Sequence, residues 1–276
     1  MRILLSYAYK PYTTAVYYER AFRAMGHEVT RCAPDESSWV ASDLQLDLFV
    51  WIEAGGGIHP LLVPPNVRTC ALYIDSHTQR GWHVEDAKRY DHVFVSDIRY
   101  VGEYGPRAHW LPMACDPGLH TPTRTEPPEY DVAFVGNTYP GSPLYEDRRQ
   151  TLAALAKRYK CNFQSGVYFQ DMADVYASAK VAFNKSVMGD LNMRVFEAMC
   201  SGRPLVTDAV EGLWRCFEPG VHLATVLPGG RPDVVIDTLL DHPDRAAEIG
   251  ASGRVEVIAH HTYAHRAAQM LQEAGL

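Results

Sequence analysis

The chain has 276 residues, of which 47% are hydrophobic and 21% are charged, a composition typical of a globular protein with one large or two modest domains. Its formal net charge of -7 disfavours nucleic acid as a partner, because an extended phosphate-binding surface requires clustered basic residues. Six cysteines lie apart without a Cys-x-x-Cys pair, which indicates buried thiols in a reducing compartment. The chain opens directly on a short apolar run, and no run reaches membrane-spanning length, so we expect a cytoplasmic protein without a membrane span.

The first part of the chain alternates short apolar runs with helical patterns. It predicts a strand at residues 2–8, a helix at 13–25, a strand at 27–32, and further strands at 46–52, 68–74, 92–96 and 109–113. This alternation favours a parallel sheet covered by helices. We therefore assign residues 1–115 to an N-terminal Rossmann-like domain.

Residues 116–130 contain four prolines among polar residues, a composition typical of a linker. After this segment the alternation restarts, which predicts a second Rossmann-like domain at residues 131–260. Its predicted strands are 131–137, 161–164, 180–184, 204–207 and 222–226, and its predicted helices are 147–159, 170–179, 193–201 and 232–240. From Arg245 the chain reads as helical, with breaks predicted near residues 250–253 and 261–263.

Residues 192–208 join a short helix to a buried strand and place charged side chains at the joint. Arg194 and Glu197 fall away from the apolar stripe of the helix, and Gly202 ends it. Joints of this kind usually face a ligand. The same spacing also allows Arg194 and Glu197 to form an i,i+3 surface ion pair with no further role.

Three phrases of the second half occur in an order found in one enzyme group. They are Asp131-Val-Ala-Phe-Val-Gly-Asn137 followed by Arg148 or Arg149, Asn192-x-Arg194-x-Phe196-Glu197-x-x-x-x-Gly202, and His261-Thr-Tyr-x-x-Arg266. Together with the two-half organisation, they resemble the group 1 glycosyltransferases of the GT-B fold, especially the CgeB-like (spore-maturation-protein-like) group. Shorter phrases at residues 73–75, 91–96 and 111–116 extend the resemblance into the first half.

The resemblance implies an α/β protein with two Rossmann-like domains facing a cleft and a C-terminal helix, residues 261–276, that packs back toward the first domain. It further implies a hexosyltransferase-like enzyme that needs no cofactor and no metal. The donor, a nucleoside-diphosphate sugar, is expected mainly on the second half. The acceptor, a glycan, protein or small molecule, is expected mainly on the first.

The resemblance also implies roles for particular residues of the second half. Glu197 is expected to accept hydrogen bonds from both ribose hydroxyls. Arg194 and Lys185, with the helix N-terminus near Asn192, are expected to neutralise the diphosphate leaving group. The backbone at Gly136 and Asn137 is expected to approach the same phosphates.

The chain departs from the group at two positions. Many retaining relatives carry a glutamate eight positions before Glu197, where this chain has Gly189 followed by Asp190. The loop after the first predicted strand, residues 6–11, lacks the glycine-rich turn of many GT-B enzymes. Retention at the anomeric carbon is still favoured, and in that mechanism the leaving phosphate accepts the acceptor proton.

Two polar clusters follow strands of the first half. Asp75 and His77 offer a carboxylate and an imidazole for acceptor contact, or for proton transfer in an inverting enzyme. An Asp75 that merely caps the next turn explains the same residues. Residues 55–57 are three glycines before His59, which allow either a close ligand approach or an ordinary loop.

A metal site is disfavoured by the histidine pattern. His261 and His265 form one i,i+4 pair beside His260, but there is no His-Glu-x-x-His motif and no cysteine at metal-ligand spacing.

Three other functions compete with glycosyl transfer. One is a sugar-nucleotide epimerase or hydrolase on the same fold. Another is a catalytically silent nucleotide-sugar-binding protein, which Gly189 would allow. The third is a two-domain sensor of small ligands.

Overall fold

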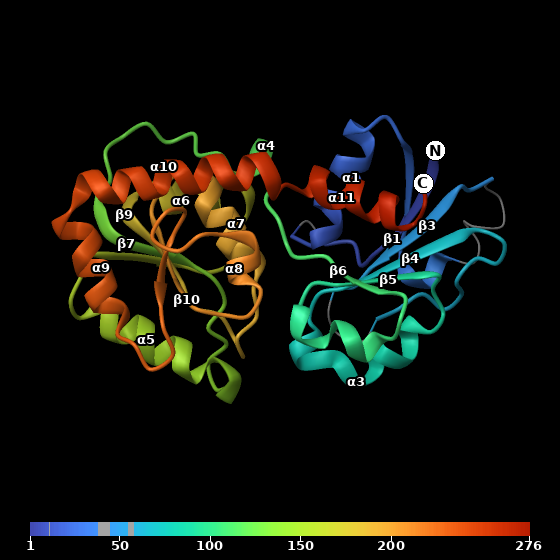
Figure 1. Cartoon of the computed structure of the whole chain (residues 1–276), viewed down its shortest axis with the longest axis horizontal. Helices are drawn as coiled ribbons and strands as arrows, with labels where there is room; N and C mark the ends of the chain where they lie inside the picture. Colours follow the sequence, from blue (N-terminus) through green and yellow to red (C-terminus); the bar gives the residue numbers. More distant parts are fainter. Residues whose placement is uncertain (11, 38–44, 55–57) are drawn as a thin grey trace. The chain divides into compact units, whose positions relative to one another are not determined.

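The structure is a computed structural model that describes residues 1–10, 12–37, 45–54 and 58–276 (Figure 1). The chain forms two compact units. The first consists of Met1–Pro112 together with Tyr263–Leu276, and the second consists of Met113–Thr262.

The first unit is built on a parallel sheet of six strands in the order β2-β1-β3-β4-β5-β6. All six strands were predicted, with boundaries that differ by a few residues. They are β1 Arg2–Ser6, β2 Glu28–Cys32, β3 Leu48–Ile52, β4 Arg68–Tyr73, β5 His92–Val95 and β6 Ala108–Trp110. Every residue of β3 is buried, as expected for a central strand whose two faces are both covered.

The helices of the first unit include one from the C-terminal end of the chain. They are α1 Thr14–Ala24, α3 Ser76–Ala87 and α11 Tyr263–Glu273, with 3-10 turns η1 Pro34–Glu36 and η2 Ile98–Tyr104. Helix α11 lies beside α1 (Figure 1). The ring of Tyr263 stacks on Tyr17 with centroids 4.6 Å apart, and Arg266 Nε donates to the carbonyl of Pro112 at 2.8 Å. The prediction that the C-terminal helix returns to the first half is confirmed.

The second unit is built on a parallel sheet of five strands in the order β11-β10-β9-β7-β8. The strands are β7 Tyr130–Val135, β8 Cys161–Gln164, β9 Ala179–Asn184, β10 Leu205–Asp208 and β11 Ala224–Val226. The helices are α4 Pro117–His120, α5 Glu146–Ala156, α6 Phe169–Ala177, α7 Met193–Cys200, α8 Leu213–Cys216, α9 Pro232–Asp241 and α10 Pro243–His260, with the 3-10 turn η3 Pro143–Tyr145. Apolar side chains from the strands and from α5, α9 and α10 form one buried core.

The segment predicted as a linker, residues 116–130, packs within the second unit. Helix α4 contacts α6 and α7. The backbone N–H groups of Thr123 and Arg124 donate to the carboxylate of Asp174 at 2.7 and 2.9 Å. The prolines therefore shape a segment that is fastened by hydrogen bonds rather than a free spacer.

The break predicted near residues 250–253 is wrong, because α10 continues through both glycines. A Cβ added at Gly250 would lie 2.4 Å from the carbonyl oxygen of Gly202, and one at Gly253 would lie 2.2 Å from that of His222. The two glycines let the helix approach neighbouring backbone closely, which outweighs their low helix propensity.

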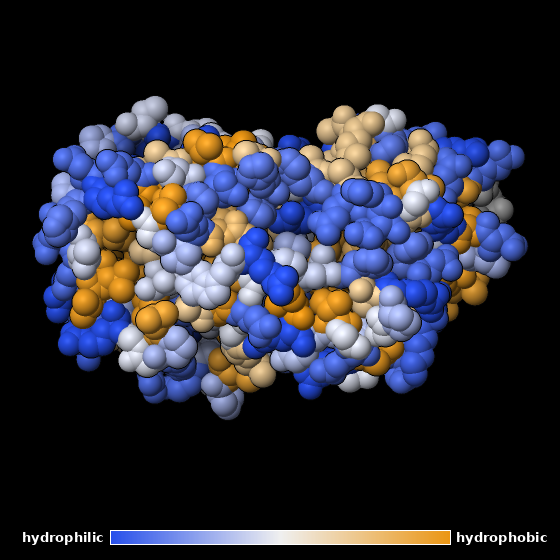
Figure 2. All heavy atoms as spheres, viewed as in Figure 1, coloured by the Kyte–Doolittle hydropathy of each residue, from blue (hydrophilic) through white to orange (hydrophobic). Residues whose placement is uncertain are grey.

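The surface view shows mainly hydrophilic residues, with hydrophobic residues in separate patches on the visible face (Figure 2). Within the described ranges, no helix is both long and apolar enough to cross a bilayer.

Candidate functional site

The strand order of the second unit creates a switch point at the end of β7. The chain runs from β7 to β8 on one side and then to β9 on the other. Ligands of parallel α/β sheets bind outside the carboxyl ends of the strands at such a point. Gly136 follows β7 and Lys185 follows β9, so two of the predicted binding residues flank this position.

Helix α7 begins beside the switch point with Asn192 as its N-cap. Asn192 Oδ1 accepts a hydrogen bond from the backbone N–H of Arg194 at 3.1 Å. The side chain is only 8% exposed, and its Nδ2 has no hydrogen-bond partner among the described residues. A buried amide donor left open at a helix N-terminus, where backbone N–H groups also point outward, is suited to an anion.

Gly136 and Arg194, predicted separately as binding residues, lie against each other. A Cβ added at Gly136 would stand 2.8 Å from Phe134 Cζ and 2.9 Å from Arg194 Nε. Any other residue at position 136 would therefore displace the guanidinium. Arg194 forms no ion pair with a carboxylate in the part of the chain that the structure describes.

Arg148 is a further site residue, which the sequence analysis placed in a motif without assigning it a role. It is 3% exposed, and it donates from Nε to the carbonyl of Lys185 at 2.9 Å and from Nη1 to the carbonyl of Asn137 at 2.8 Å. Burial, together with the positive charge of Arg194, lowers the pKa of Arg148 to about 10. Arg148 thus ties the loops after β7 and β9 together. The sequence feature that could have identified Arg148 is its position in the first turn of α5, the helix that follows the Gly136 loop.

Lys185 and Asn137 also have partners within the unit. Lys185 Nζ lies 2.8 Å from Asp147 Oδ2 and 3.9 Å from Asp208 Oδ2. The carboxylate of Asp208 also accepts from the backbone N–H of Ser186 at 2.9 Å, which fixes the loop after β9. The side-chain amide of Asn137 donates to Tyr139 OH at 3.0 Å, so only its backbone adjoins the switch point.

Glu197 does not form the surface ion pair that its spacing from Arg194 allowed. It is only 3% exposed, and its Oε1 lies 3.6 Å from Nε2 of the fully buried His120. The polar side of α7 is therefore covered as well as the apolar side, because α4 packs against it. Sequence reasoning missed His120 because it fell in the predicted linker.

A cavity of about 330 Å³ adjoins Gly136 on the β8 side of the switch point. Its walls combine apolar groups of β7, β8 and α5 with polar groups of the loops, namely Phe134, Gly136, Thr138, Arg149, Leu152, Ala153, Ala156, Phe163, Gln164 and Ser165. The strand ends thus offer both positive charge and room for a flat apolar group.

In the first unit, Asp75 and His77 lie at the start of α3, beyond the carboxyl end of β4. The backbone N–H of Asp75 donates to Glu53 Oε2 at 3.1 Å. Asp75 is the N-cap residue of α3, although its side chain makes no capping hydrogen bond. Burial lowers the pKa of His77, while the carboxylates of Asp75 and Asp97 oppose the shift. His77 is therefore set up as a neutral imidazole at neutral pH.

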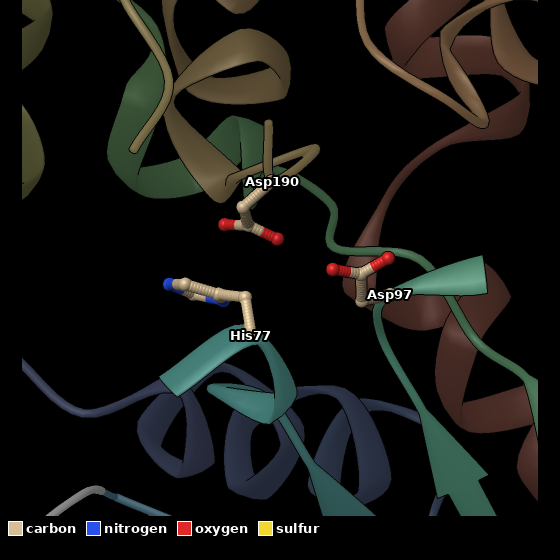
Figure 3. Close-up of side chains that lie close together, drawn as sticks. All are labelled: His77, Asp97 and Asp190. Carbon is tan, nitrogen blue, oxygen red and sulfur yellow. The ribbon is translucent and has the colours of Figure 1, made fainter. Parts of the chain in front are cut away.

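Asp97 is a further neighbour that the sequence did not single out. It follows β5, and one of its carboxylate oxygens lies within 4.8 Å of one ring nitrogen of His77 (Figure 3). Arg99 donates to it from Nε at 2.9 Å. Asp190, which the figure also labels, belongs to the second unit, where its N–H donates to Val187 O at 3.2 Å in the loop before α7.

The sequence offered two other candidates, the loop at residues 55–59 and the histidines near the C-terminal end. Residues 55–57 lie outside the described residues, and the ring of His59 packs near Trp82 with centroids 5.6 Å apart. His261 Nε2 contacts the carbonyl of Cys216 at 3.0 Å. Among the described residues, His260, His261 and His265 do not converge at metal-ligand spacing.

Several solved structures share the architecture of this chain. Sucrose-phosphate synthase from Thermosynechococcus elongatus aligns with a TM-score of 0.68 at 14% identity, over 98% of this chain and 97% of that one. Anabaena Alr3699/HepE in complex with UDP-glucose aligns with a TM-score of 0.68 at 11% identity, over 100% and 99%. AviGT4, a glycosyltransferase involved in avilamycin A biosynthesis, aligns with a TM-score of 0.65 at 16% identity, over 99% and 97%. The fold is the predicted GT-B fold of glycosyltransferases.

The sequence itself places the chain in a family. The model of the glycosyl transferase-like family matches residues 119–272, which is more than half of the chain. The chain therefore belongs to the glycosyl transferase-like family and is a glycosyltransferase, as predicted. A comparison with curated proteins gives no match.

Proposed function

We propose that this enzyme transfers a sugar from a nucleoside-diphosphate sugar to an acceptor, and that its second unit binds the nucleotide. The observation that carries the proposal is the open donor set at the N-terminus of α7. There, Asn192 Nδ2 has no partner among the described residues, and the adjacent Arg194 pairs with no carboxylate among them. Both groups lie at the switch point where ligands of such sheets bind.

The local charge favours a diphosphate as the anion. Burial lowers the pKa of Arg148, and the nearby positive charge of Arg194 lowers that pKa further by repulsion. A phosphate group beside Arg194 would relieve that repulsion and would also accept from Asn192 and from the helix N-terminus. Lys185 contributes less net charge than we expected from the sequence, because Asp147 and Asp208 already face it.

Glu197 is proposed to bind the ribose, one helical turn beyond the phosphate-binding groups. Ionised carboxylates accept but cannot donate, which suits a pair of ribose hydroxyls. The HepE neighbour was solved with UDP-glucose, which supports a nucleotide sugar as the donor of this chain.

The finer features of the reaction are part of the same proposal. Arg194, Lys185 and the α7 N-terminus stabilise the charge that develops on the leaving diphosphate, the role that a divalent cation fills in other transferases. The enzyme then retains anomeric configuration, with the leaving phosphate accepting the acceptor proton. Asp75 and His77 contact the acceptor. The CgeB-like phrases of the sequence and the six free thiols accord with a cytoplasmic, CgeB-like enzyme.

Calorimetry with UDP, ADP, GDP and CDP, followed by turnover of the matching nucleotide sugars over an acceptor panel, tests the proposal. Arg194→Ala and Glu197→Gln should each weaken the preferred nucleotide about tenfold or more while the variants fold normally. Addition of EDTA should leave turnover unchanged. Normal binding and turnover in both variants would reject the site.

A catalytically silent nucleotide-sugar-binding protein is the second candidate, favoured by Gly189 at the position of the second glutamate. It predicts tight donor binding without product for any acceptor. An epimerase or hydrolase predicts product in the absence of an acceptor. The turnover assay separates these outcomes from glycosyl transfer.

A further inference from the structure

We propose that hydrogen peroxide converts the thiols of Cys115 and Cys200 into a disulfide, and that this disulfide restrains α7, the helix that carries the proposed nucleotide-binding groups. The effect on binding rests on the proposed function of the second unit, whereas the disulfide itself can be detected without a nucleotide. Both cysteines belong to that unit, and both side chains are fully buried. Their thiols are hydrogen-bonded to each other.

Contacts of the surrounding segments hold the two cysteines side by side. Cys115 lies just before α4 and forms a parallel bridge with Thr262, the last residue of the second unit. Cys200 ends α7, which packs against α4. The guanidinium of Arg254 on α10 donates both to the carbonyl of Cys200 and to the hydroxyl of Thr121, which directly follows α4, the latter at 3.2 Å. The thiol contact is therefore fixed by packing on both sides of α4.

The two thiols differ in acidity. The hydrogen bond from the Cys115 thiol lowers the pKa of Cys200 and outweighs the opposing effect of burial. The positive charge of Arg254 and a hydrogen bond from Thr121 lower that pKa further. The same thiol contact, together with burial, raises the pKa of Cys115. Cys200 is thus the thiolate that attacks an oxidant, and Cys115 is the thiol that closes the disulfide.

Three other cysteines lack this activation. Burial raises the pKa of Cys32 and of Cys161 to about 11 and that of Cys70 to about 12. These thiols keep their protons at neutral pH, and the protonated form reacts poorly with peroxides. Cys161 is the most exposed of the three. It is therefore the matched control, because it is easier to reach than Cys200 but is not activated.

The oxidation takes place in two steps. The sulfur of Cys200 attacks one oxygen of hydrogen peroxide, the O–O bond breaks, and hydroxide leaves and takes a proton from solvent. The sulfur of Cys115 then attacks the resulting sulfenic acid, so that the S–S bond forms and the S–O bond breaks. The hydroxyl group leaves with the Cys115 proton as water. The two thiols together lose two electrons, and the peroxide is reduced to two molecules of water.

The disulfide pulls on α7 because its sulfurs stand closer together than hydrogen-bonded thiols do. The backbone of Cys115 is held by its bridge to Thr262, so the last turn of α7 must move toward it. Glu197, the proposed ribose ligand, lies one turn earlier on the same helix. Oxidation therefore displaces this carboxylate and weakens nucleotide binding.

Peptide mapping of the full chain tests the disulfide. The protein is treated with hydrogen peroxide, its free thiols are alkylated with iodoacetamide, and its peptides are analysed by mass spectrometry without reduction. We expect a disulfide between Cys115 and Cys200 that dithiothreitol removes. Cys161→Ser should leave the disulfide unchanged. Cys115→Ser should instead leave a sulfenic acid at Cys200 that dimedone labels. The mapping of the unaltered chain decides the question even where a variant folds poorly.

Calorimetry tests the restraint on α7, with the preferred nucleotide among UDP, ADP, GDP and CDP as the probe. Oxidation should weaken binding about fivefold or more, and dithiothreitol should restore it. Peroxide treatment of Cys115→Ser, in which no disulfide can form, should change the affinity less than about twofold. This comparison separates the disulfide from other oxidative damage.

Absence of the disulfide between Cys115 and Cys200, or equally rapid oxidation of Cys161, would overturn the proposed site. A disulfide that leaves nucleotide affinity unchanged would overturn the restraint on α7. Failure of the proposed function gives a different result, because the reduced protein would then bind none of the four nucleotides while the mapping still shows whether the disulfide forms.

Discussion

The guanidinium of Arg194 occupies the space that a side chain at Gly136 would need, with Nε 2.9 Å from the position of a Cβ. Two residues that are 58 positions apart in sequence (194 minus 136) therefore depend on each other at the end of β7. The glycine is required here by the close approach of a functional side chain.

Replacement of Gly136 by alanine tests this dependence. The added methyl should push Arg194 out of position and weaken nucleotide binding about tenfold, with a stability cost of about 1–3 kcal/mol from contact with Phe134. Calorimetry and urea unfolding measure the two effects. If Arg194 mediates the binding effect, Gly136→Ala should cause little extra loss of affinity in an Arg194→Ala background. Additive losses would contradict that account.

Arg148 offers a second test, on stability. In Arg148→Met, the carbonyls of Asn137 and Lys185 lose their buried donors. We expect the free energy of unfolding to fall by about 2–4 kcal/mol, measured by urea denaturation. The matched control is Arg158→Met, which removes half-exposed ion pairs with Asp233 and Asp237 and should cost much less, because water screens these pairs. Equal losses in the two variants would show that Arg148 does not tie the loops.

The glycines of α10 make a third prediction. Gly250→Ala and Gly253→Ala should each destabilise the protein by about 2 kcal/mol or more, because a methyl group would overlap backbone carbonyls of Gly202 and His222. Gly81→Ala in α3 is the control. Among the described residues, no atom outside the backbone of the helix itself lies within 4 Å of a Cβ there, so alanine should stabilise the helix by up to about 1 kcal/mol. A stabilised Gly250→Ala variant would contradict the close approach.

The lowered pKa of His83 predicts how the free energy of unfolding depends on pH. It is fully buried, its Nδ1 lies 3.0 Å from Tyr104 OH, and burial lowers its pKa from 6.5 to about 4. Between pH 6.5 and pH 4, His83 is protonated in the unfolded chain but stays neutral in the native state. The free energy of unfolding therefore falls as the pH drops from 6.5 toward 4. The loss from this residue should reach about 3 kcal/mol by pH 4 and should be absent above neutrality. Urea unfolding at several pH values measures it. His83→Phe should show a shallower acid loss, and an unchanged slope would contradict the assignment.

Much of the fold could be predicted from the local sequence pattern. Strands such as β3 and β5 were predicted nearly to the residue, since buried parallel strands are short apolar runs with clear boundaries. The helix α10 was divided wrongly at Gly250 and Gly253. Local propensity disfavours glycine in a helix, whereas the packing that requires it comes from chain segments far away in sequence.

The site could be predicted only in part, because some of its contacts come from packing between segments that are far apart in sequence. Gly136, Asn192 and Arg194 stand at strand and helix ends, so their pattern predicted where they lie. The partners of Arg148 and the approach of His120 to Glu197 depend on how α5 and α4 pack. Proline content suggested a linker at residues 116–130, but hydrogen bonds to Asp174 and the burial of His120 fasten that segment.

The central claim is that the second unit binds a nucleoside diphosphate at the N-terminus of α7. Isothermal titration calorimetry of the full chain with UDP, ADP, GDP and CDP tests it most directly, with Arg194→Ala and Asn192→Ala beside the unaltered protein. We predict saturable binding of at least one of the four, weakened about tenfold or more in Arg194→Ala and less strongly in Asn192→Ala. Binding of none of them, or equal binding by all three proteins, would contradict the claim.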